Sequence, residues 1–338
     1  MQNTTTMQAA VAVEYGSPNV LSVQEVSAPS VGAGEILVRV HASPVTQGDR
    51  RLRSSDFPGF TWLPGRLMMG LLRPRNATGG TMFAGEVIAI GEAVTRFAVG
   101  DRVFGQVGHG AWAEYLTMSE TDPVAQMPTG LSYAEAAALP YGAGTARHFL
   151  NDFAGLRAGE RVLIVGATGE VGRSAVQLAR HMGAEVTAVG RRGLELAREL
   201  GASHVIDATR EDFTANGERY DVIFDTSGTL GFDDVRGSLS DTGRFMSLYM
   251  SIKLLLQMAL TSMTEGPRAI TGVSMGTQES FLELRALIEE GAVRPILDRH
   301  YPLERIVEAH ARVEGREGLG SVMVTVGSPV AEVVAEAA

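Results

Sequence analysis

The segment from residue 161 to 192 constrains the fold of this chain most, because it contains every part of a nucleotide-binding βαβ unit in order. It reads RVLIVGATGEVGRSAVQLARHMGAEVTAVGRR. A first apolar run is followed by a glycine-rich turn, a helical pattern and a second apolar run that ends before two arginines. This order predicts strand, turn, helix and strand within about thirty residues.

The glycine-rich turn is predicted to bind the pyrophosphate of a dinucleotide, and an unliganded turn is the alternative. Gly169 would let the backbone approach the phosphates, and Gly172 would let the helix pack closely on the strand. The free N–H groups and the positive dipole end of the helix N-terminus favour an anion at this point. The candidate residues of the turn are Gly166, Ala167, Thr168, Gly169, Glu170, Val171 and Gly172.

The residues after the second strand predict which dinucleotide binds. An acidic residue there would accept hydrogen bonds from the ribose 2′-hydroxyl of NAD and would repel a 2′-phosphate. This chain has Gly190, Arg191 and Arg192 instead. Since guanidinium groups suit phosphate geometry, we expect NADP(H) as the cofactor. The alternative is that the two arginines are solvated residues at the start of a helix.

Two different rhythms of apolar residues predict two domains. From about residue 8 to 126, short apolar runs separated by Gly, Pro and Asp predict a β domain. From about residue 130, an Ala-rich helical stretch is followed by alternating strands and helices. This alternation predicts a doubly wound parallel sheet, and the whole chain is therefore expected to be an α/β protein.

Composition excludes several classes of function. The 338 residues contain no cysteine, which excludes disulfides, thiolate zinc sites, iron–sulfur clusters and cysteine nucleophiles. The net charge of −10 argues against a nucleic-acid partner. The N-terminus lacks the pattern of a secretory signal, so we expect a cytoplasmic protein without an integral membrane segment.

The two most apolar stretches, 60–72 and 252–263, are too short to span a bilayer, which needs about 20 apolar residues. They are rich in Met and Leu. Three alternatives stay open for them: packing in the core, a lid over a cleft, or contact with a membrane surface.

Several segments together resemble the medium-chain dehydrogenase/reductase superfamily, and within it the zinc-free quinone oxidoreductase and enone reductase branch. These segments are AAVAVEYGSPNVLSVQEV, AGEVIAIGEAVTRFAVGDRVFG, AAALPYGAGTA, VLIVGATGEVGRSAVQLARHMGAEV and LIEEGAVRPILDRHYPLERIVEAHARVEGREGLGSVMVTV. The resemblance implies a chaperonin-10-like β domain of residues 1–127, completed by 279–338, and a Rossmann domain of residues 128–278. It also implies a homodimer.

The resemblance further implies a reaction without metal. Zinc-dependent members of the superfamily hold a catalytic zinc at three positions that correspond here to Thr46, Thr81 and Tyr141. None of these is a good zinc ligand in this setting, so no metal is expected. Without a Lewis acid, hydride transfer from NADPH to a small apolar quinone or α,β-unsaturated carbonyl compound is the expected activity. The alternatives are a metal-free carbonyl or alcohol dehydrogenase, and a non-catalytic cofactor-binding protein.

The resemblance also suggests roles for individual residues. Tyr141 would lie beside the nicotinamide, where its phenol could donate a proton or a hydrogen bond to the substrate oxygen, unless it only shapes the pocket. Thr46 and Thr81 would line the emptied metal site, as walls more readily than as catalysts. Thr145 matches a family threonine near the cofactor, and the alternative is a helix residue that bonds its own backbone. Three residues in later β-rich runs complete the cofactor-binding candidates: Ser227, Tyr249 and Ser274.

The stretch from residue 46 to 53 departs from the zinc-free branch, which usually has Asn-Pro-x-Asp where this chain has Thr-Gln-Gly-Asp. Asp49 is expected to anchor the loop more readily than to act as a base. The three arginines that follow are expected to form an exposed charge cluster, with an anionic substrate as the alternative; they are Arg50, Arg51 and Arg53.

Overall fold

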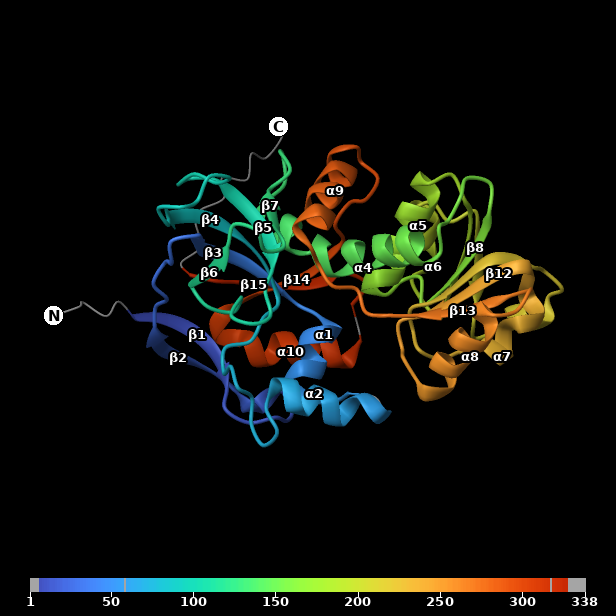
Figure 1. Cartoon of the computed structure of the whole chain (residues 1–338), viewed down its shortest axis with the longest axis horizontal. Coiled ribbons are helices and arrows are strands. Elements are labelled where there is room, and N and C mark those ends of the chain that lie inside the picture. The colour runs from blue at the N-terminus through green and yellow to red at the C-terminus, as the bar shows by residue number, and fades with distance from the viewer. Residues whose placement is uncertain (1–5, 58, 317, 328–338) are drawn as a thin grey trace.

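A computed structural model describes residues 6–57, 59–316 and 318–327 of the chain. Figure 1 shows two bodies side by side, one built on a parallel sheet and the other on a largely antiparallel sheet. The predicted α/β class is confirmed. The domain boundaries after residues 127 and 278 stay predictions, and the first five residues of the predicted β domain and its last eleven lie outside the described residues.

The parallel sheet has the strand order expected of a dinucleotide-binding fold. Each neighbouring pair of strands is parallel. Counted from β8, the order across the sheet is 3-2-1-4-5-6, and it reverses between β8 and β11. The strands in this order are β10 (His204–Asp207), β9 (Glu185–Gly190), β8 (Arg161–Val165), β11 (Tyr220–Asp225), β12 (Leu239–Ser247) and β13 (Arg268–Thr271).

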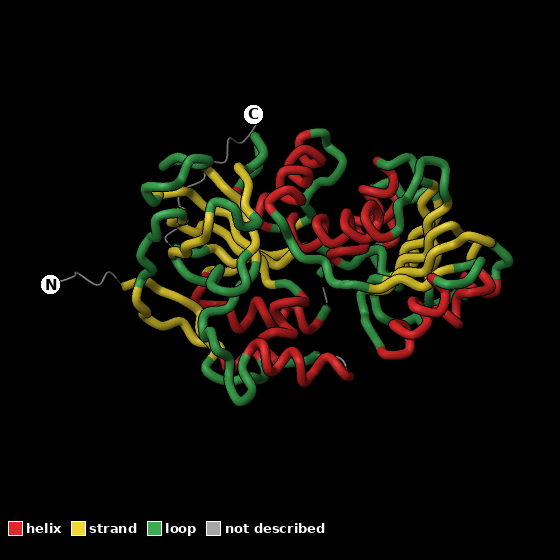
Figure 2. The backbone as a smooth tube through the Cα atoms, in the orientation of Figure 1, coloured by secondary structure: helices red, strands yellow, loops and turns green. Residues whose placement is uncertain are grey.

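Helices cover both faces of this sheet, because successive strand residues point to opposite faces and both sets are apolar (Figure 2). Ile164 packs in a cluster with α5 (Glu170–His181) and α6 (Leu194–Glu199). Its neighbour Leu163 packs in another cluster with α7 (Phe232–Val235) and with Leu254 of α8 (Ile252–Ser262).

A helical segment from residue 133 to 153 joins the two bodies. It was predicted as helical, but the structure interrupts it with two π-helical turns. Pro140 has no N–H group, so the regular pattern of helical hydrogen bonds cannot continue through it. The parts are α3 (Tyr133–Ala137), the π turn η3 (Pro140–Gly144), α4 (Thr145–Arg147) and the π turn η4 (His148–Phe153).

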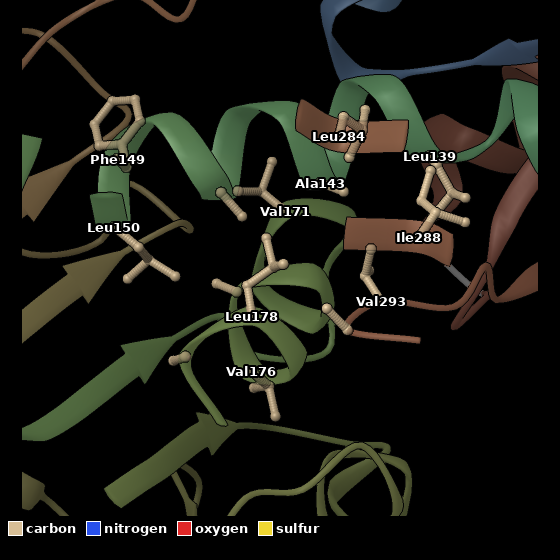
Figure 3. Packing of buried hydrophobic residues seen from close by; sticks show 14 of the residues in the cluster. Leu139, Ala143, Phe149, Leu150, Val171, Val176, Leu178, Leu284, Ile288 and Val293 are labelled. Carbon is tan, nitrogen blue, oxygen red and sulfur yellow. The ribbon is translucent and has the colours of Figure 1, made fainter. Parts of the chain in front are cut away.

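The packing behind this segment holds it in place. In Figure 3, side chains of the segment lie over α5 and beside α9 (Gln278–Glu289). Ala143 and Leu150 come from the segment, Val171 and Leu178 from α5, and Ile288 from α9. This single apolar cluster therefore fixes η3 and the N-terminus of α5 relative to each other.

The second sheet takes strands from both ends of the chain. Its C-terminal strands β15 and β14 extend the sheet beyond β3, and β6 also pairs with β3. In order, the strands are β14 (Leu297–Pro302), β15 (Ser321–Thr325), β3 (Glu35–Val45), β4 (Met82–Ile90), β5 (Arg102–Gln106) and β7 (Val124–Gln126), with β6 (Tyr115–Ser119) beside β3 and a separate hairpin of β1 (Thr6–Ala12) and β2 (Leu21–Ser27). The predicted completion of the β domain by the C-terminal region is thus visible in the strand pairing.

Three helices accompany the second sheet: α1 (Gln47–Ser54), α2 (Trp62–Met69) and α10 (Ile306–Gly315). The short 3₁₀ turns are η1 (Pro18–Val20), η2 (Gly59–Thr61), η5 (Phe213–Ala215), η6 (Arg236–Ser238) and η7 (Leu303–Arg305). No helix in the described part of the chain is long and apolar enough to cross a bilayer.

Core packing, one of the alternatives for the stretches 60–72 and 252–263, is wrong for both. In α2, no residue is buried, and in α8 only Leu254 is. Met68 is 69% exposed and Leu260 is 65% exposed. An apolar sequence is buried only where other elements cover it, and here each helix lies at the outside of its sheet (Figure 1).

Candidate active site

A cleft of about 580 Å³ runs along the carboxyl edge of the parallel sheet. Ligands of open α/β sheets bind at this edge, where the strand order reverses. Residues that follow each of the six strands line it: Gly166, Arg191, Ala208, Ser227, Tyr249 and Ser274. The other wall comes from the second body and includes Gln47 and Arg51 of α1 and Ser321 of β15. The cleft therefore lies between the two sheets.

The glycine-rich turn has the close contacts that its glycines were predicted to allow. A Cβ atom on Gly172 would lie 2.2 Å from the carbonyl oxygen of Gly166, so α5 could not pack as it does with any other residue there. Gly166 itself has a φ of +76°, a conformation that favours glycine. Gly169 is the N-cap of α5 and supplies no side-chain cap. The first N–H groups of the helix have no side-chain acceptor at this cap.

Most of the predicted cofactor residues line this one cleft. Gly166, Thr168, Gly169, Glu170 and Val171 do so from the turn and the start of α5. Ala167 is buried and does not line the cleft, and Gly172 acts through packing alone. The remaining cleft-lining candidates are Thr145, Arg191, Arg192, Ser227, Tyr249 and Ser274.

Arg191 and Arg192 are exposed at the end of β9 and form no ion pair with any described residue. Gly190, the residue before them, lies close to the phosphate turn, since a Cβ atom added to it would be 3.7 Å from the Thr168 hydroxyl. The two arginines therefore leave β9 beside this turn. Arg316, an exposed residue of the other body, also lines the cleft. Sequence reasoning missed Arg316 because only the tertiary fold brings it there.

Glu170 links the phosphate turn to the second sheet. The Ser321 hydroxyl donates a hydrogen bond of 3.0 Å to Glu170, and Arg173 Nη2 donates one of 2.7 Å to the Ser321 hydroxyl. Burial raises the pKa of Glu170 to about 7, against the opposing effect of Arg173. The carboxyl group thus changes its charge near neutral pH, at the end of the cleft where phosphates are predicted to bind.

Tyr141 lines the cleft from the π turn η3. Its ring packs against Gly48 of α1: a Cβ atom added to Gly48 would lie only 3.1 Å from Tyr141 Cε2. The phenol makes no hydrogen bond with a described residue. Burial, and then the nearby Glu170 carboxyl, raise the pKa of Tyr141 above its ordinary value, whereas Arg51 acts in the opposite direction. The phenol is therefore a neutral hydrogen-bond donor free to meet a ligand.

Arg51 and Tyr249 meet across the cleft from opposite walls. The Arg51 guanidinium lies over the Tyr249 ring, 4.4 Å from its centroid. Arg51 forms no ion pair with a described residue, and both residues line the cleft. The Arg51 cation is thus held on an aromatic face, close enough to the Tyr141 phenol to act on its pKa.

The predicted exposed cluster of three arginines is wrong. Arg50 pairs with Asp56 at 2.7 Å on the surface, but Arg53 is buried and pairs with Glu314 of α10. Arg51 alone remains unpaired and turns into the cleft. Residues at positions 50, 51 and 53 of one helix point in different directions, about 100° apart per residue, and this periodicity could have separated them.

Thr46 and Thr81 do not line the cleft. The Thr46 hydroxyl donates to Asp49 Oδ2 at 2.6 Å, and the Thr81 hydroxyl donates to Asp49 Oδ1 at 2.8 Å. Thr46 also accepts from the Asp49 backbone N–H and so caps α1. Thr81 faces a separate cavity of about 50 Å³. Asp49 anchors the loop as predicted, and the expected role of the two threonines as walls of the emptied metal site stays a prediction.

These residues do not fit a zinc ion. Two of the three positions are hydroxyl groups already engaged by Asp49, and the third is a phenol with a raised pKa. Among the described residues, no group of three or more His, Asp or Glu side chains is arranged to hold a metal ion.

Comparison with known proteins agrees with this architecture. The family described as alcohol dehydrogenase GroES-like domain matches residues 32–129, and the family described as zinc-binding dehydrogenase matches residues 200–324. The quinone oxidoreductase of Sus scrofa is 31% identical, with 94% of this chain and 97% of the relative covered. The chain belongs to the quinone oxidoreductase-like branch of the medium-chain dehydrogenase/reductase superfamily. This confirms the predicted family.

Two further relatives extend the comparison. A chloroplastic quinone-oxidoreductase homolog of Spinacia oleracea is 29% identical, over 93% of this chain and 97% of the relative. The solved quinone oxidoreductase of Coxiella burnetii is 28% identical and has a TM-score of 0.82, covering 96% of this chain and all of that one. The family consists of nicotinamide-dependent oxidoreductases. The predicted chaperonin-10-like and Rossmann folds are both confirmed.

Proposed function

We propose that this protein is an NADPH-dependent reductase that transfers hydride, without metal, to a small apolar quinone or α,β-unsaturated carbonyl compound. The observation that carries the proposal is the set of groups that line one cleft. They include an uncapped helix N-terminus and the unpaired Arg191 and Arg192. They also include the free phenol of Tyr141 and the unpaired guanidinium of Arg51.

The cofactor would be held by the turn residues 166–171 and by the strand ends. The α5 N-terminus would receive the pyrophosphate, and Arg191 and Arg192 would receive the 2′-phosphate of NADPH. Thr145, Ser227, Tyr249 and Ser274 would contact the remainder, in agreement with their positions on the cleft. When bound, NADPH supplies the hydride.

Tyr141 and Arg51 would act on the substrate oxygen. A carbonyl compound that accepts hydride at its conjugated carbon gains negative charge on this oxygen. A phenol and a guanidinium aimed at that position stabilise the charge by hydrogen bonding, and this replaces the electrostatic part of a metal ion's role. The proton that completes the reduction would come from Tyr141 or from water.

The test is an acceptor screen with purified protein. We expect oxidation of NADPH in the presence of quinones and enones, measured as loss of absorbance at the nicotinamide band. Oxidation of NADH should be slower. Efficient oxidation of simple primary alcohols would favour the metal-free alcohol dehydrogenase. Tight NADPH binding without turnover of any acceptor would favour a non-catalytic cofactor-binding protein.

Homodimer formation and a cytoplasmic location also belong to this proposal. The family resemblance supports the dimer, and sedimentation of the purified chain tests it. For the location, the spinach relative is described as chloroplastic, so imaging of the full chain in its own cell is the relevant experiment.

A further inference from the structure

The stretch from residue 60 to 72, here called the apolar segment, exposes a row of large apolar side chains. It comprises the end of η2, all of α2 and the turn that follows. The exposed side chains are Phe60, Trp62, Leu63, Leu67, Met68, Leu71 and Leu72. The side chain of Leu72 is the most exposed of these, at 88%. Single exposed apolar residues are normal on a protein surface, but a contiguous set of this kind marks an interaction site.

The apolar segment is held in a defined conformation. The Tyr15 hydroxyl donates a hydrogen bond of 2.8 Å to the carbonyl oxygen of Gly70. The Arg66 guanidinium lies 4.1 Å from the centroid of the Tyr15 ring and also over Trp62. Gly70 has a φ of +121°, so the chain turns sharply before Leu71. The outward direction of the leucines is therefore imposed by contacts with the rest of the β domain.

The cleft does not explain the exposure. No described residue of the apolar segment lines the cleft of the candidate active site, so the alternative of a lid is not supported. In Figure 1, α2 lies at the lower edge of the molecule, outside α1 and α10. Its apolar face is directed away from the protein.

Unpaired positive charge lies beside this surface. Between Asp56 and Glu86 the chain has three arginines and no acidic residue, although its net charge is −10. Arg66 is engaged by the aromatic rings, but Arg73 and Arg75 are exposed and form no ion pair with a described residue. Two free cations thus lie directly beside the exposed Leu71 and Leu72.

We propose that the apolar segment docks the protein peripherally on a lipid bilayer that contains anionic lipids. Apolar and aromatic side chains next to cations are the combination that inserts into the interface of such a membrane. A helix of eight residues is only about 12 Å long, which suits insertion at the surface and not a span. The proposal does not depend on the proposed function.

A second copy of the chain is a poorer occupant of the same surface. In a symmetric dimer, a patch at the interface faces the same patch of the partner. Such an interface would collect Arg73 and Arg75 of both copies, and residues 57–85 supply no acidic side chain to pair with them.

Vesicle binding of the full chain tests the proposal. At low salt we expect co-sedimentation with vesicles of phosphatidylcholine and phosphatidylglycerol, and much weaker binding to phosphatidylcholine alone. The chain has two tryptophans, and Trp112 is buried whereas Trp62 is exposed. Binding should therefore shift the fluorescence emission to the blue, and Trp62→Phe should abolish the shift.

Two surface variants give the expected magnitudes. Leu71→Ser with Leu72→Ser should weaken vesicle binding at least tenfold, since burial of a single leucine is worth about tenfold or more. Arg73→Ala with Arg75→Ala should weaken binding to anionic vesicles roughly 25-fold, because each arginine contributes about fivefold near an anionic surface. Both variants change exposed side chains and should keep wild-type NADPH binding.

The matched control is Leu256→Ser with Leu260→Ser on α8. These leucines are similarly exposed, but the cation of their helix, Lys253, pairs with Asp233 at 2.7 Å. We expect unchanged vesicle binding for this control. Failure of wild type to bind anionic vesicles, or an equal loss in the control, would overturn the proposal. Dissociation of a dimer by the Leu71 and Leu72 changes would assign the surface to a second copy.

Discussion

Replacement of both Arg191 and Arg192 by Ala tests the cofactor preference most directly. The two guanidinium groups are exposed, line the cleft and have no protein partner among the described residues, so a 2′-phosphate would be their main anionic ligand. A hydrogen bond to a charged group is worth about 1.5–3 kcal/mol. Because both groups are exposed, the lower value applies, and the pair should contribute about 3 kcal/mol. This corresponds to roughly 10²-fold in Kd, and tighter geometry would raise it toward 10³-fold.

Titration of NADPH and NADH into wild type and the double variant measures this effect. We expect the Kd for NADPH to rise by about 10²- to 10³-fold and the Kd for NADH to change little. Arg198→Ala is the matched control, since this exposed arginine of α6 pairs with Glu195 and does not line the cleft. The reasoning fails if wild type binds NADH as tightly as NADPH. An equal rise in the Kd of both cofactors would indicate that the arginines bind the pyrophosphate and not the 2′-phosphate.

Four further outcomes are expected. Tyr141→Phe should lower kcat for enones by about 10²- to 10³-fold with NADPH affinity nearly unchanged, and an unchanged kcat would leave water as the proton source. Gly172→Ala should lower the free energy of unfolding by roughly 1–3 kcal/mol and weaken NADPH binding, because its Cβ would overlap Gly166. Denaturant unfolding measures the first effect. In the control Gly237→Ala, the added Cβ meets open space, so stability and NADPH binding should stay unchanged. Burial raises the folded-state pKa of Glu170 from 4.5 to about 7, so the wild-type protein loses stability as pH rises through this interval. The Tm of Glu170→Gln should therefore equal that of wild type near pH 4.5 and exceed it above pH 7. A gain in Tm that does not depend on pH would contradict this cause. Finally, elemental analysis should find no stoichiometric zinc and EDTA should leave activity intact, while one zinc per subunit would refute the metal-free proposal.

The glycine-rich turn and its place at the sheet edge were largely predictable from the sequence. A phosphate-binding turn is made by consecutive residues, and its glycines are required by contacts within the same few residues, such as that of Gly172 with Gly166. Alternating strands and helices with short connections predict a parallel sheet, and the carboxyl edge of this sheet is a common binding site. Arg191 follows β9 and therefore had to lie at this edge.

The surroundings of Tyr141 and Arg51 depended on tertiary structure. Arg51 was predicted in an exposed cluster, but the direction of α1 turns it toward Tyr249 of the other body. Thr46 and Thr81 were expected to line the emptied metal site, and only the structure shows that Asp49 holds both hydroxyl groups. These contacts join segments that are distant along the chain, and no local pattern encodes such distances.

The apolar stretches show the same division. The sequence by itself determined that residues 60–72 and 252–263 are apolar and too short to span a membrane. Only the tertiary structure decided that both are exposed, because burial depends on which other elements cover a side chain and not on the side chain itself. The turn follows from local interactions of the backbone, whereas strand order, exposure and side-chain partners follow from how distant segments of the chain pack together.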